Sequence, residues 1–212
     1  MRPTFSVDAR GNAVVAAAMR TPLAVVAILA LSAVTTNPAL AAPDELMPCK
    51  KLSVKADKAD PSSGKVKFVC KAGKSGFVIP DGASSPLTNG TGMSLLIRDL
   101  GSSLNIVPGV VLPSSGWSGI GNPPGSKGFR YRDASKQGAC RVVVVTTKQV
   151  AGKCRAVIGP GNLPVVGDVG MTLHFPGTQD YCGQLGGTTV HNDAASLLRK
   201  NSPAPASCQP VP

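Results

Sequence analysis

The sequence predicts an all-β domain of sandwich or jelly-roll type, with one short C-terminal helix and a cleaved N-terminal signal helix. Three observations lead to this fold class. About nine short runs of β-type residues follow one another at the close spacing typical of sandwiches and barrels. Turn-forming residues separate them, and the 212-residue chain contains 24 Gly and 19 Pro. No long amphipathic helix alternates with the runs, which argues against an α/β layout.

The N-terminal segment has the pattern of a secretory signal. Residues 21–36 form an almost unbroken apolar run, shorter than a stable bilayer anchor needs. Arg20 precedes the run, and the small-x-small sequence Ala39-Leu40-Ala41 follows it. We therefore expect residues 1–41 to be a signal peptide, with an uncleaved anchor helix as the disfavoured alternative. Met19 has the position of a natural initiator, because a signal of ordinary length starts there.

The remaining residues, 43–212, are expected to form a single disulfide-bonded domain. Its six cysteines suit three disulfides in an exported chain. Their spacings contain no Cys-x-x-Cys pair, which argues against a metal site. Six cysteines allow 15 connectivities. Pairing of sequence neighbours is our prediction among them: Cys49–Cys70, Cys140–Cys154 and Cys182–Cys208.

The first hairpin gives that pairing local support. Apolar and lysine residues alternate on both sides of the turn signal 60–64. Placing Val54 opposite Val66 brings Cys70 opposite Lys50, one residue from Cys49. A small irregularity near Pro48 would complete the pair.

Further elements follow in order along the chain. Asn89-Gly90 is typical of a type I′ hairpin turn. Residues 193–201 begin with an aspartate and end with two basic residues, which favours a helix. The Pro-rich tail 202–212 is expected to be extended and held by Cys208. The expected strands are Leu52–Ala56, Lys65–Lys71, Met93–Arg98, Asn105–Leu112, Lys127–Arg132, Arg141–Thr147, Arg155–Ile158, Leu163–Val166 and Met171–Phe175.

The composition offers little for catalysis. Apolar residues make up 42% of the chain, which excludes a charged disordered tail or a multi-pass membrane protein. Two His and one Glu are present, and no nucleophile elbow, zinc-protease or nucleotide-binding motif occurs. A dispersed triad built on His174 or His191, with Asp180 or Asp193, remains an alternative. We expect no enzyme activity, no catalytic residue, no metal and no cofactor.

The formal net charge of +11 is concentrated near the N-terminal end of the domain. Alternation places five lysines on one face of the first hairpin, which suggests a patch for acidic polymers. A solvated sheet face is the plainer interpretation, and it is favoured because lysines also block edge-to-edge aggregation. Lysine without interleaved aromatic or arginine residues is a weak nucleic-acid signature. The five are Lys51, Lys55, Lys65, Lys67 and Lys71.

Aromatic residues give a second candidate surface. One Gly/Pro-rich stretch of the sequence contains Trp117, Phe129 and Tyr131. Phe129 and Tyr131 would point the same way on a strand, with Arg130 and Arg132 on the other side. Trp117 and Tyr131 are candidates for a sugar-stacking platform. Core packing is the favoured alternative, because aromatic side chains bury large areas.

Several of these elements recur in a known group of proteins. Gly116-Trp117, the segment Lys127–Asp133, and Tyr181-Cys182 followed by Gly186-Gly187 are the main ones, together with the four cysteines from Cys140 onward. Over roughly half of its length the chain thus resembles an uncharacterised family of secreted, cysteine-containing β-rich bacterial modules from proteobacteria. The resemblance implies export and a β-rich architecture only, because no catalytic residue, ligand or cofactor is assigned to that group.

These observations predict the general class of function but not a specific activity. We expect a basic, secreted or periplasmic bacterial protein without enzyme activity, associated with the cell envelope and free of a transmembrane anchor after cleavage. A module binding carbohydrate or an anionic envelope polymer is the first alternative. A secreted hydrolase with dispersed catalytic residues is the second, and nucleic acid is not an expected partner.

Overall fold

The computed structural model describes residues 44–57, 60, 64–102, 104–156, 163–176 and 179–208. All of them belong to one compact unit, Ala39–Pro212. The expected signal segment, residues 1–41, lies outside the described residues. Within the described part of the chain, no helix has the length and hydropathy needed to span a bilayer.

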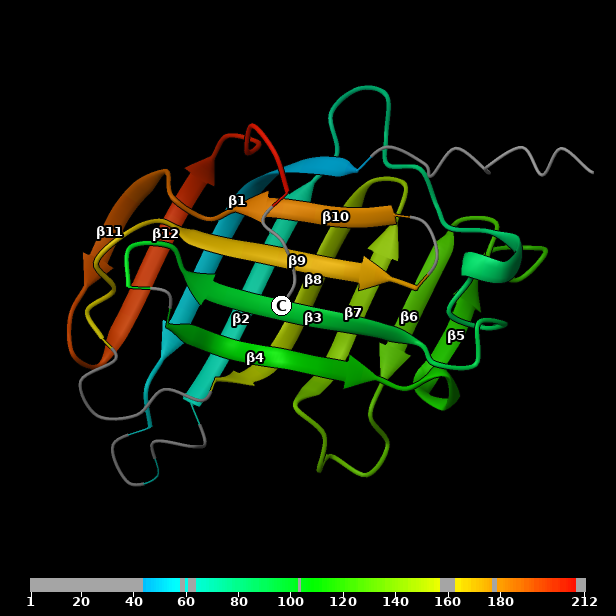
Figure 1. The fold of residues 1–212 in the computed structure, drawn as a ribbon, viewed down its shortest axis with the longest axis horizontal. Helices are drawn as coiled ribbons and strands as arrows, with labels where there is room; N and C mark the ends of the chain where they lie inside the picture. Colours follow the sequence, from blue (N-terminus) through cyan, green and yellow to red (C-terminus); the bar gives the residue numbers. More distant parts are fainter. Residues whose placement is uncertain are drawn as a thin grey trace, which may run out of the picture. The chain divides into compact units, whose positions relative to one another are not determined.

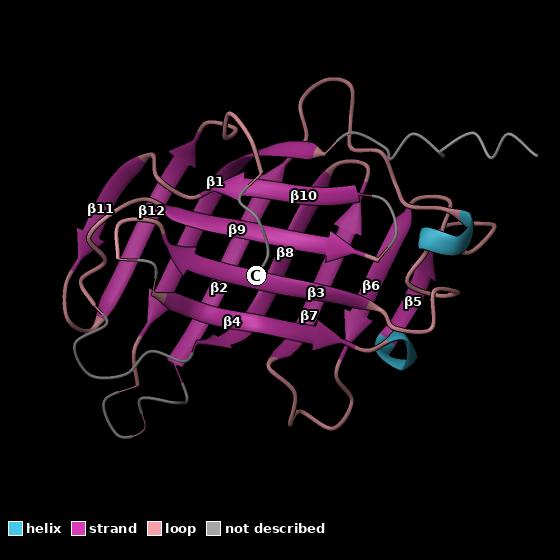
Figure 2. Cartoon of the chain, viewed as in Figure 1, coloured by secondary structure: helices cyan, strands magenta, loops and turns pink. Residues whose placement is uncertain are grey.

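The described residues form a curled β-sheet of twelve strands, so the all-β expectation is confirmed at this level (Figure 1). Within the described residues, the helical elements are two short 3-10 turns, Gly82–Ser84 and Ser114–Gly116 (Figure 2). The strands are β1 (Glu45–Lys55), β2 (Gly64–Lys71), β3 (Met93–Asp99), β4 (Asn105–Leu112), β5 (Trp117–Ile120), β6 (Gly128–Arg132), β7 (Cys140–Thr146), β8 (Gln149–Ala156), β9 (Val169–Phe175), β10 (Gln179–Gln184), β11 (Thr188–Asn192) and β12 (Ser196–Ser202).

Strand β1 connects two arms of this sheet. Its first residues, Glu45–Pro48, pair in parallel with β10, which continues through β9 and β3 to β4; we call these four strands the first arm. From Cys49 onward β1 pairs with β2 on one side and β12 on the other. The second arm comprises β2, β8, β7, β6 and β5, with β12 and β11 beyond β1. The sheet curls so that first-arm strands cross in front of second-arm strands (Figure 1).

One hydrophobic cluster draws residues from both arms. Fully buried side chains include Leu52 and Phe68 of the second arm and Leu95 and Leu173 of the first. Tyr181 of β10 packs against Phe175, with ring centroids 5.1 Å apart. Burial raises the pKa of the Tyr181 phenol, whose hydroxyl donates a hydrogen bond to the carbonyl of Val78.

The hairpin of β1 and β2 has the register that the sequence predicts. Val54 lies opposite Val66 and Leu52 opposite Phe68. A bulge between Cys49 and Lys51 takes up one residue, and this places Cys49 directly opposite Cys70. The irregularity expected near Pro48 thus lies just after Cys49.

Three cysteine pairs lie at disulfide distance, and they are the sequence-neighbour pairs. The Cys49–Cys70 disulfide sits where β1 passes from one arm to the other. Gly183 of β10 covers it, and a Cβ at that position would lie 2.6 Å from the sulfur of Cys49. The close approach therefore requires glycine. Three disulfides are compatible with an extracellular or periplasmic location.

The prediction of a C-terminal helix is wrong. The segment from Ser196 is strand β12, which pairs with β1 and β11. Asp193 does not start a helix; its carboxylate accepts hydrogen bonds from the amides of Ala195 and Ser196 and closes the β11–β12 turn. Leu197 is fully buried opposite Val54. Pairing on both sides and this burial outweigh the local helix preference.

Several expected strand positions also need correction. The strand placed at Arg155–Ile158 starts earlier, at Gln149, and residues 157–158 lie outside the described residues. Leu163–Val166 is not a strand. Asn89-Gly90 forms a turn in a loop and not in a hairpin, because the residues just before it are not in a strand. Asn89 Oδ1 accepts hydrogen bonds from the amides of Thr91 and Gly92 in this loop. Strands β5, β10 and β11 were not predicted from the sequence.

Candidate functional site

The outer face of the second arm carries rows of cations. In β1 and β2, all five candidate lysines are exposed on one face, as the alternation predicts. The same face continues onto β8, where Arg155 lies opposite Lys65 and Lys153 opposite Lys67. We call these residues the basic face: Lys51, Lys55, Lys65, Lys67, Lys71, Lys153 and Arg155.

Like charges are direct neighbours on this face. Lys55, Lys65 and Arg155 form one row across three adjacent strands. Directly opposed like charges destabilise a sheet, and adjacent strands are only about 4.8 Å apart. Beyond β7, the exposed residues Arg130 and Arg132 of β6 extend the same surface.

A bulge in β7 adds a further arginine. Cys140 lies opposite Cys154 and Val142 opposite Lys153, so Arg141 is the extra residue between them. Bulges re-aim a side chain and are common beside functional sites. The exposed Arg141 side chain lines a hollow in the basic face, and the Cys140–Cys154 disulfide fixes the two strands beneath it.

That hollow has a volume of about 540 Å³ and is the candidate ligand pocket. Buried Val66 and Cys154 form its floor. Five cationic side chains stand around it together with two carboxylates of the β1–β2 loop, Asp57 and Asp60. The five cations are Lys65, Lys67, Arg141, Lys153 and Arg155.

The loop between β6 and β7 positions Arg155. Its Nη2 donates a hydrogen bond of 2.8 Å to the carbonyl oxygen of Lys136. Lys136 has a left-handed backbone conformation, with φ 59°. Asp133 holds this loop, since its carboxylate accepts from the Ser135 hydroxyl at 2.6 Å and from the Gly138 amide at 2.7 Å. These bonds lower the pKa of Asp133.

The aromatic candidates lie inside the protein. Trp117 is 7% exposed and Tyr131 is 5% exposed, with their rings 5.4 Å apart. The indole N–H donates to the carbonyl of Leu112, 3.0 Å away, and burial raises the pKa of the Tyr131 phenol. Trp117 and Tyr131 therefore do not form a sugar-stacking surface.

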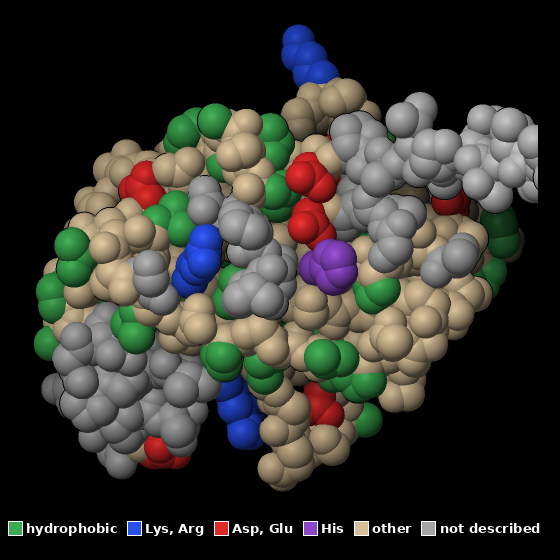
Figure 3. Space-filling view, in the orientation of Figure 1, with side chains coloured by type: hydrophobic (Ala, Val, Ile, Leu, Met, Phe, Trp, Pro, Cys, Tyr) green, Lys and Arg blue, Asp and Glu red, His purple; other side chains and the backbone are tan. Residues whose placement is uncertain are grey.

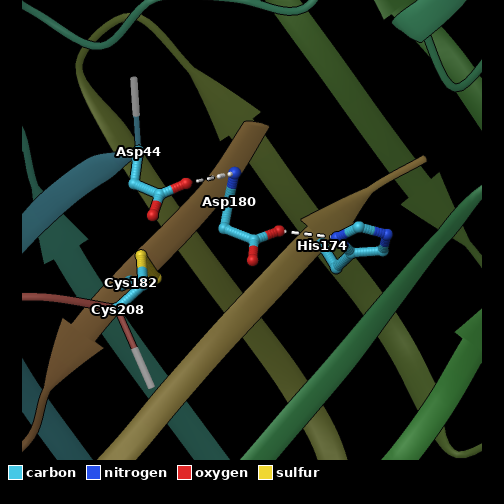
Figure 4. The surroundings of a disulfide bond; sticks show 5 residues. All are labelled: Asp44, His174, Asp180, Cys182 and Cys208. Atoms are coloured by element: carbon cyan, nitrogen blue, oxygen red, sulfur yellow. Dashed lines mark hydrogen bonds and ion pairs between the residues drawn. A yellow bond between two sulfur atoms is a disulfide. The ribbon is translucent and has the colours of Figure 1, made fainter. Parts of the chain in front are cut away.

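The first arm carries a different group on its outer face, where a histidine lies beside acidic side chains (Figure 3). His174 Nδ1 lies 2.6 Å from Asp180 Oδ1, and the Asp180 amide donates to Asp44 (Figure 4). The Cys182–Cys208 disulfide lies next to this group on β10. Ser94 is the cross-strand neighbour of His174 on its other side.

This group has one of the two contacts that the hydrolase alternative needs, a histidine bonded to both an aspartate and a serine. His174 contacts an aspartate, but among the described residues no hydrogen bond joins it to Ser94. His191 is exposed on β11 and lies opposite Leu198. The Asp193 carboxylate accepts its hydrogen bonds from backbone amides of the β11–β12 turn. The described residues hold no group of three or more His, Cys, Asp or Glu side chains suited to a metal ion.

Only part of the pocket was predictable from the sequence. Lys153, Arg155 and Arg141 were not among the predicted site residues, and the strand that carries the first two was expected to start only at Arg155. A usable signal was present: Lys153 and Arg155 are two residues apart, like Lys65 and Lys67, and so share one face of a strand.

No protein-family description, curated protein or solved structure matches this chain. Membership of the proteobacterial secreted modules stays a prediction. Function is therefore inferred from the geometry of the basic face and its pocket.

Proposed function

We propose that this protein is a non-enzymatic module that binds an anionic polysaccharide through the basic face. One observation carries the proposal: cations lie directly opposite one another on three adjacent strands, around a pocket. Such an arrangement costs stability, and a polyanion lying across the strands offsets that cost. The row of Lys55, Lys65 and Arg155 suits a polymer whose charges repeat at short intervals.

A polysaccharide fits this surface better than a nucleic acid does. Proteins that bind single-stranded nucleic acids stack bases on exposed aromatic side chains. Trp117 and Tyr131 are buried, and the basic face consists mainly of lysines. Base readout of double-stranded nucleic acid needs an element that enters a groove, such as a helix or a free two-stranded ribbon. Strand β2 of the basic face is instead paired on both sides, with β1 and β8.

Export and envelope association complete the proposal. The three disulfides need an oxidising compartment to persist, which supports secretion or a periplasmic location. A polysaccharide-binding face would hold the exported protein at the cell envelope. We further propose that the curled sheet is a sandwich-like scaffold, with the basic face on the outside of one layer.

Retention on phosphocellulose and carboxymethyl cellulose tests the proposal, with unmodified cellulose as the neutral reference. The triple variant Lys65→Gln/Lys67→Gln/Lys153→Gln removes three charges of the basic face. We expect its affinity for both charged celluloses to fall by about tenfold or more, equivalent to at least about 1.4 kcal/mol. Retention of the unchanged protein should fall steeply with salt.

A matched variant separates the basic face from overall charge. Lys74→Gln/Lys127→Gln/Lys148→Gln removes three exposed lysines outside that face. We expect it to bind almost like the unchanged protein. Equal losses in the two triple variants would contradict the proposal, and so would tighter binding to duplex DNA than to either charged cellulose at the same salt concentration.

A further inference from the structure

We infer that the pocket of the basic face binds one phosphorylated sugar unit of the polymer, taking the phosphate with its arginines and lysines and the sugar hydroxyls with Asp57 and Asp60. The inference rests on the proposed function and names the chemical group that is recognised. It is carried by the composition of the pocket, where two carboxylates stand among five cations.

The cations favour a phosphate over a singly charged group. A phosphomonoester carries a charge of about −1.5 to −2 at neutral pH. Arg141 and Arg155 reach the pocket from β7 and β8, and their planar guanidinium groups bind phosphate oxygens in pairs. Lys65, Lys67 and Lys153 add three compact charges around the same space. A carboxylate would neutralise less of this charge.

The carboxylates explain why the ligand should be a sugar unit and not a free anion. An ionised carboxylate is an acceptor with about four lone-pair sites, so it can bind ligand hydroxyls in addition to donors of the protein. Asp57 and Asp60 line the same pocket as the five cations. They weaken the binding of a bare anion, and they strengthen the binding of an anion that has hydroxyl groups beside it.

The size and the rigidity of the pocket agree with this ligand. Its volume of about 540 Å³ exceeds that of a phosphate ion and lies within the range of small-molecule sites. Arg155 is held by the Lys136 carbonyl, and Cys154 in the floor is fixed by its disulfide. Arg155 therefore loses little side-chain freedom on binding, which favours affinity.

Calorimetric titration of the full domain with four probes tests the inference: glucose 6-phosphate, inorganic phosphate, glucuronate and glucose. We expect glucose 6-phosphate to bind most tightly, by about tenfold over inorganic phosphate and over glucuronate. Arg155→Lys keeps the charge but removes the planar fork. It should weaken the binding of glucose 6-phosphate several-fold, because a lysine cannot pair with two phosphate oxygens at once.

The carboxylates are tested by Asp57→Asn and Asp60→Asn, made separately, with Asp81→Asn in an exposed loop as the matched control. Each pocket variant should bind inorganic phosphate as tightly or more tightly, because a negative charge is gone, while the advantage of glucose 6-phosphate shrinks. Thermal melts show whether each variant is folded. The comparison of the four probes on the unchanged protein does not depend on any variant.

Equal affinities for glucose 6-phosphate and inorganic phosphate would overturn the inference, as would tighter binding of glucuronate. Either result, combined with normal retention on the charged celluloses, would leave the proposed function in place. Conversely, tight binding of glucose 6-phosphate without retention on either cellulose would support the pocket and contradict the polymer-binding function.

Discussion

Arg155 Nη2 donates a hydrogen bond to the carbonyl oxygen of Lys136, and the two residues are 19 positions apart. Lys136 adopts a backbone conformation that a residue with a side chain rarely takes, with φ 59°. Such conformations persist where the surroundings impose them, and they cluster at ligand sites. Here the imposing group is Asp133, whose carboxylate ties the start of the loop to its end.

Asp133→Ala should therefore loosen the loop and release Arg155. We expect calorimetry to show that the affinity for glucose 6-phosphate falls several-fold, because Arg155 remains charged but is no longer held in place. Asp193→Ala removes a carboxylate of the same kind from the β11–β12 turn, away from the pocket. A similar loss of affinity in both variants would contradict the positioning role of Asp133.

The Cys140–Cys154 disulfide should affect both stability and binding. Replacing both cysteines with serine opens a loop of sequence separation 14, which is expected to cost about 2–4 kcal/mol of unfolding free energy. The bulge that presents Arg141 lies beside this disulfide, so affinity for glucose 6-phosphate should fall as well.

The double variant Cys182→Ser/Cys208→Ser is the comparison for that experiment. Its disulfide has a sequence separation of 26 and ties the tail to the first arm. Denaturant unfolding should show a similar cost, while calorimetry should show unchanged binding. Loss of binding in this variant alone would contradict the location of the pocket.

Asp99 is a buried carboxylate that joins two loops. It accepts hydrogen bonds from the amides of Val166 and Gly167 and from the hydroxyl of Ser102. Burial raises its pKa, but these bonds together lower the pKa below the ordinary value of 3.8. We expect Asp99→Asn to destabilise the fold by about 1.5–3 kcal/mol at neutral pH, since charge-assisted bonds are lost.

The pH dependence of that loss follows from the sign of the shift. A carboxylate with a lowered pKa contributes its full stabilisation above the ordinary pKa, and the contribution disappears as the pH falls through the lowered value. Unfolding curves of the two proteins should thus converge below about pH 4. A difference that stays constant from pH 7 down to pH 3 would contradict this assignment.

Gly152 of β8 leaves room for a ring of the core. It lies opposite Phe68, and a Cβ there would be 2.5 Å from Phe68 Cζ. Gly152→Ala should destabilise the protein by about 1–3 kcal/mol through overpacking, measured by denaturant unfolding. Gly109→Ala in β4 is the matched control, because a Cβ at Gly109 meets nothing within 4 Å. If the two variants were equally stable, the close contact would not be a real constraint.

Local patterns in the sequence predicted those parts of the fold that depend on neighbouring residues. The β1–β2 register followed from alternation across a short turn, and the Cys49–Cys70 pair followed from that register. The helix predicted for residues 193–201 was wrong for the opposite reason. Its helical charge pattern is local, whereas the burial of Leu197 and Arg199 depends on strands more than 100 residues away.

The residues of the candidate site also fall into those that local sequence predicts and those that long-range pairing brings together. The hairpin lysines share a face because of local alternation, so they were predictable. Arg141 and Arg155 join them only through the pairing of β7 with β8 and of β8 with β2, and through one bulge. Trp117 and Tyr131 show the converse, because only the packing of the whole sheet decides that they face inward.

Strand β1 pairs with β10 over its first residues and with β2 and β12 over the rest. Neither arm can therefore melt while the other stays intact, because each would lose a central partner. Heating should give one calorimetric transition, with the enthalpy obtained from its width equal to the enthalpy obtained from its area. A fragment ending before β9 would lack β10, leave the opening residues of β1 without a neighbour, and remain unfolded.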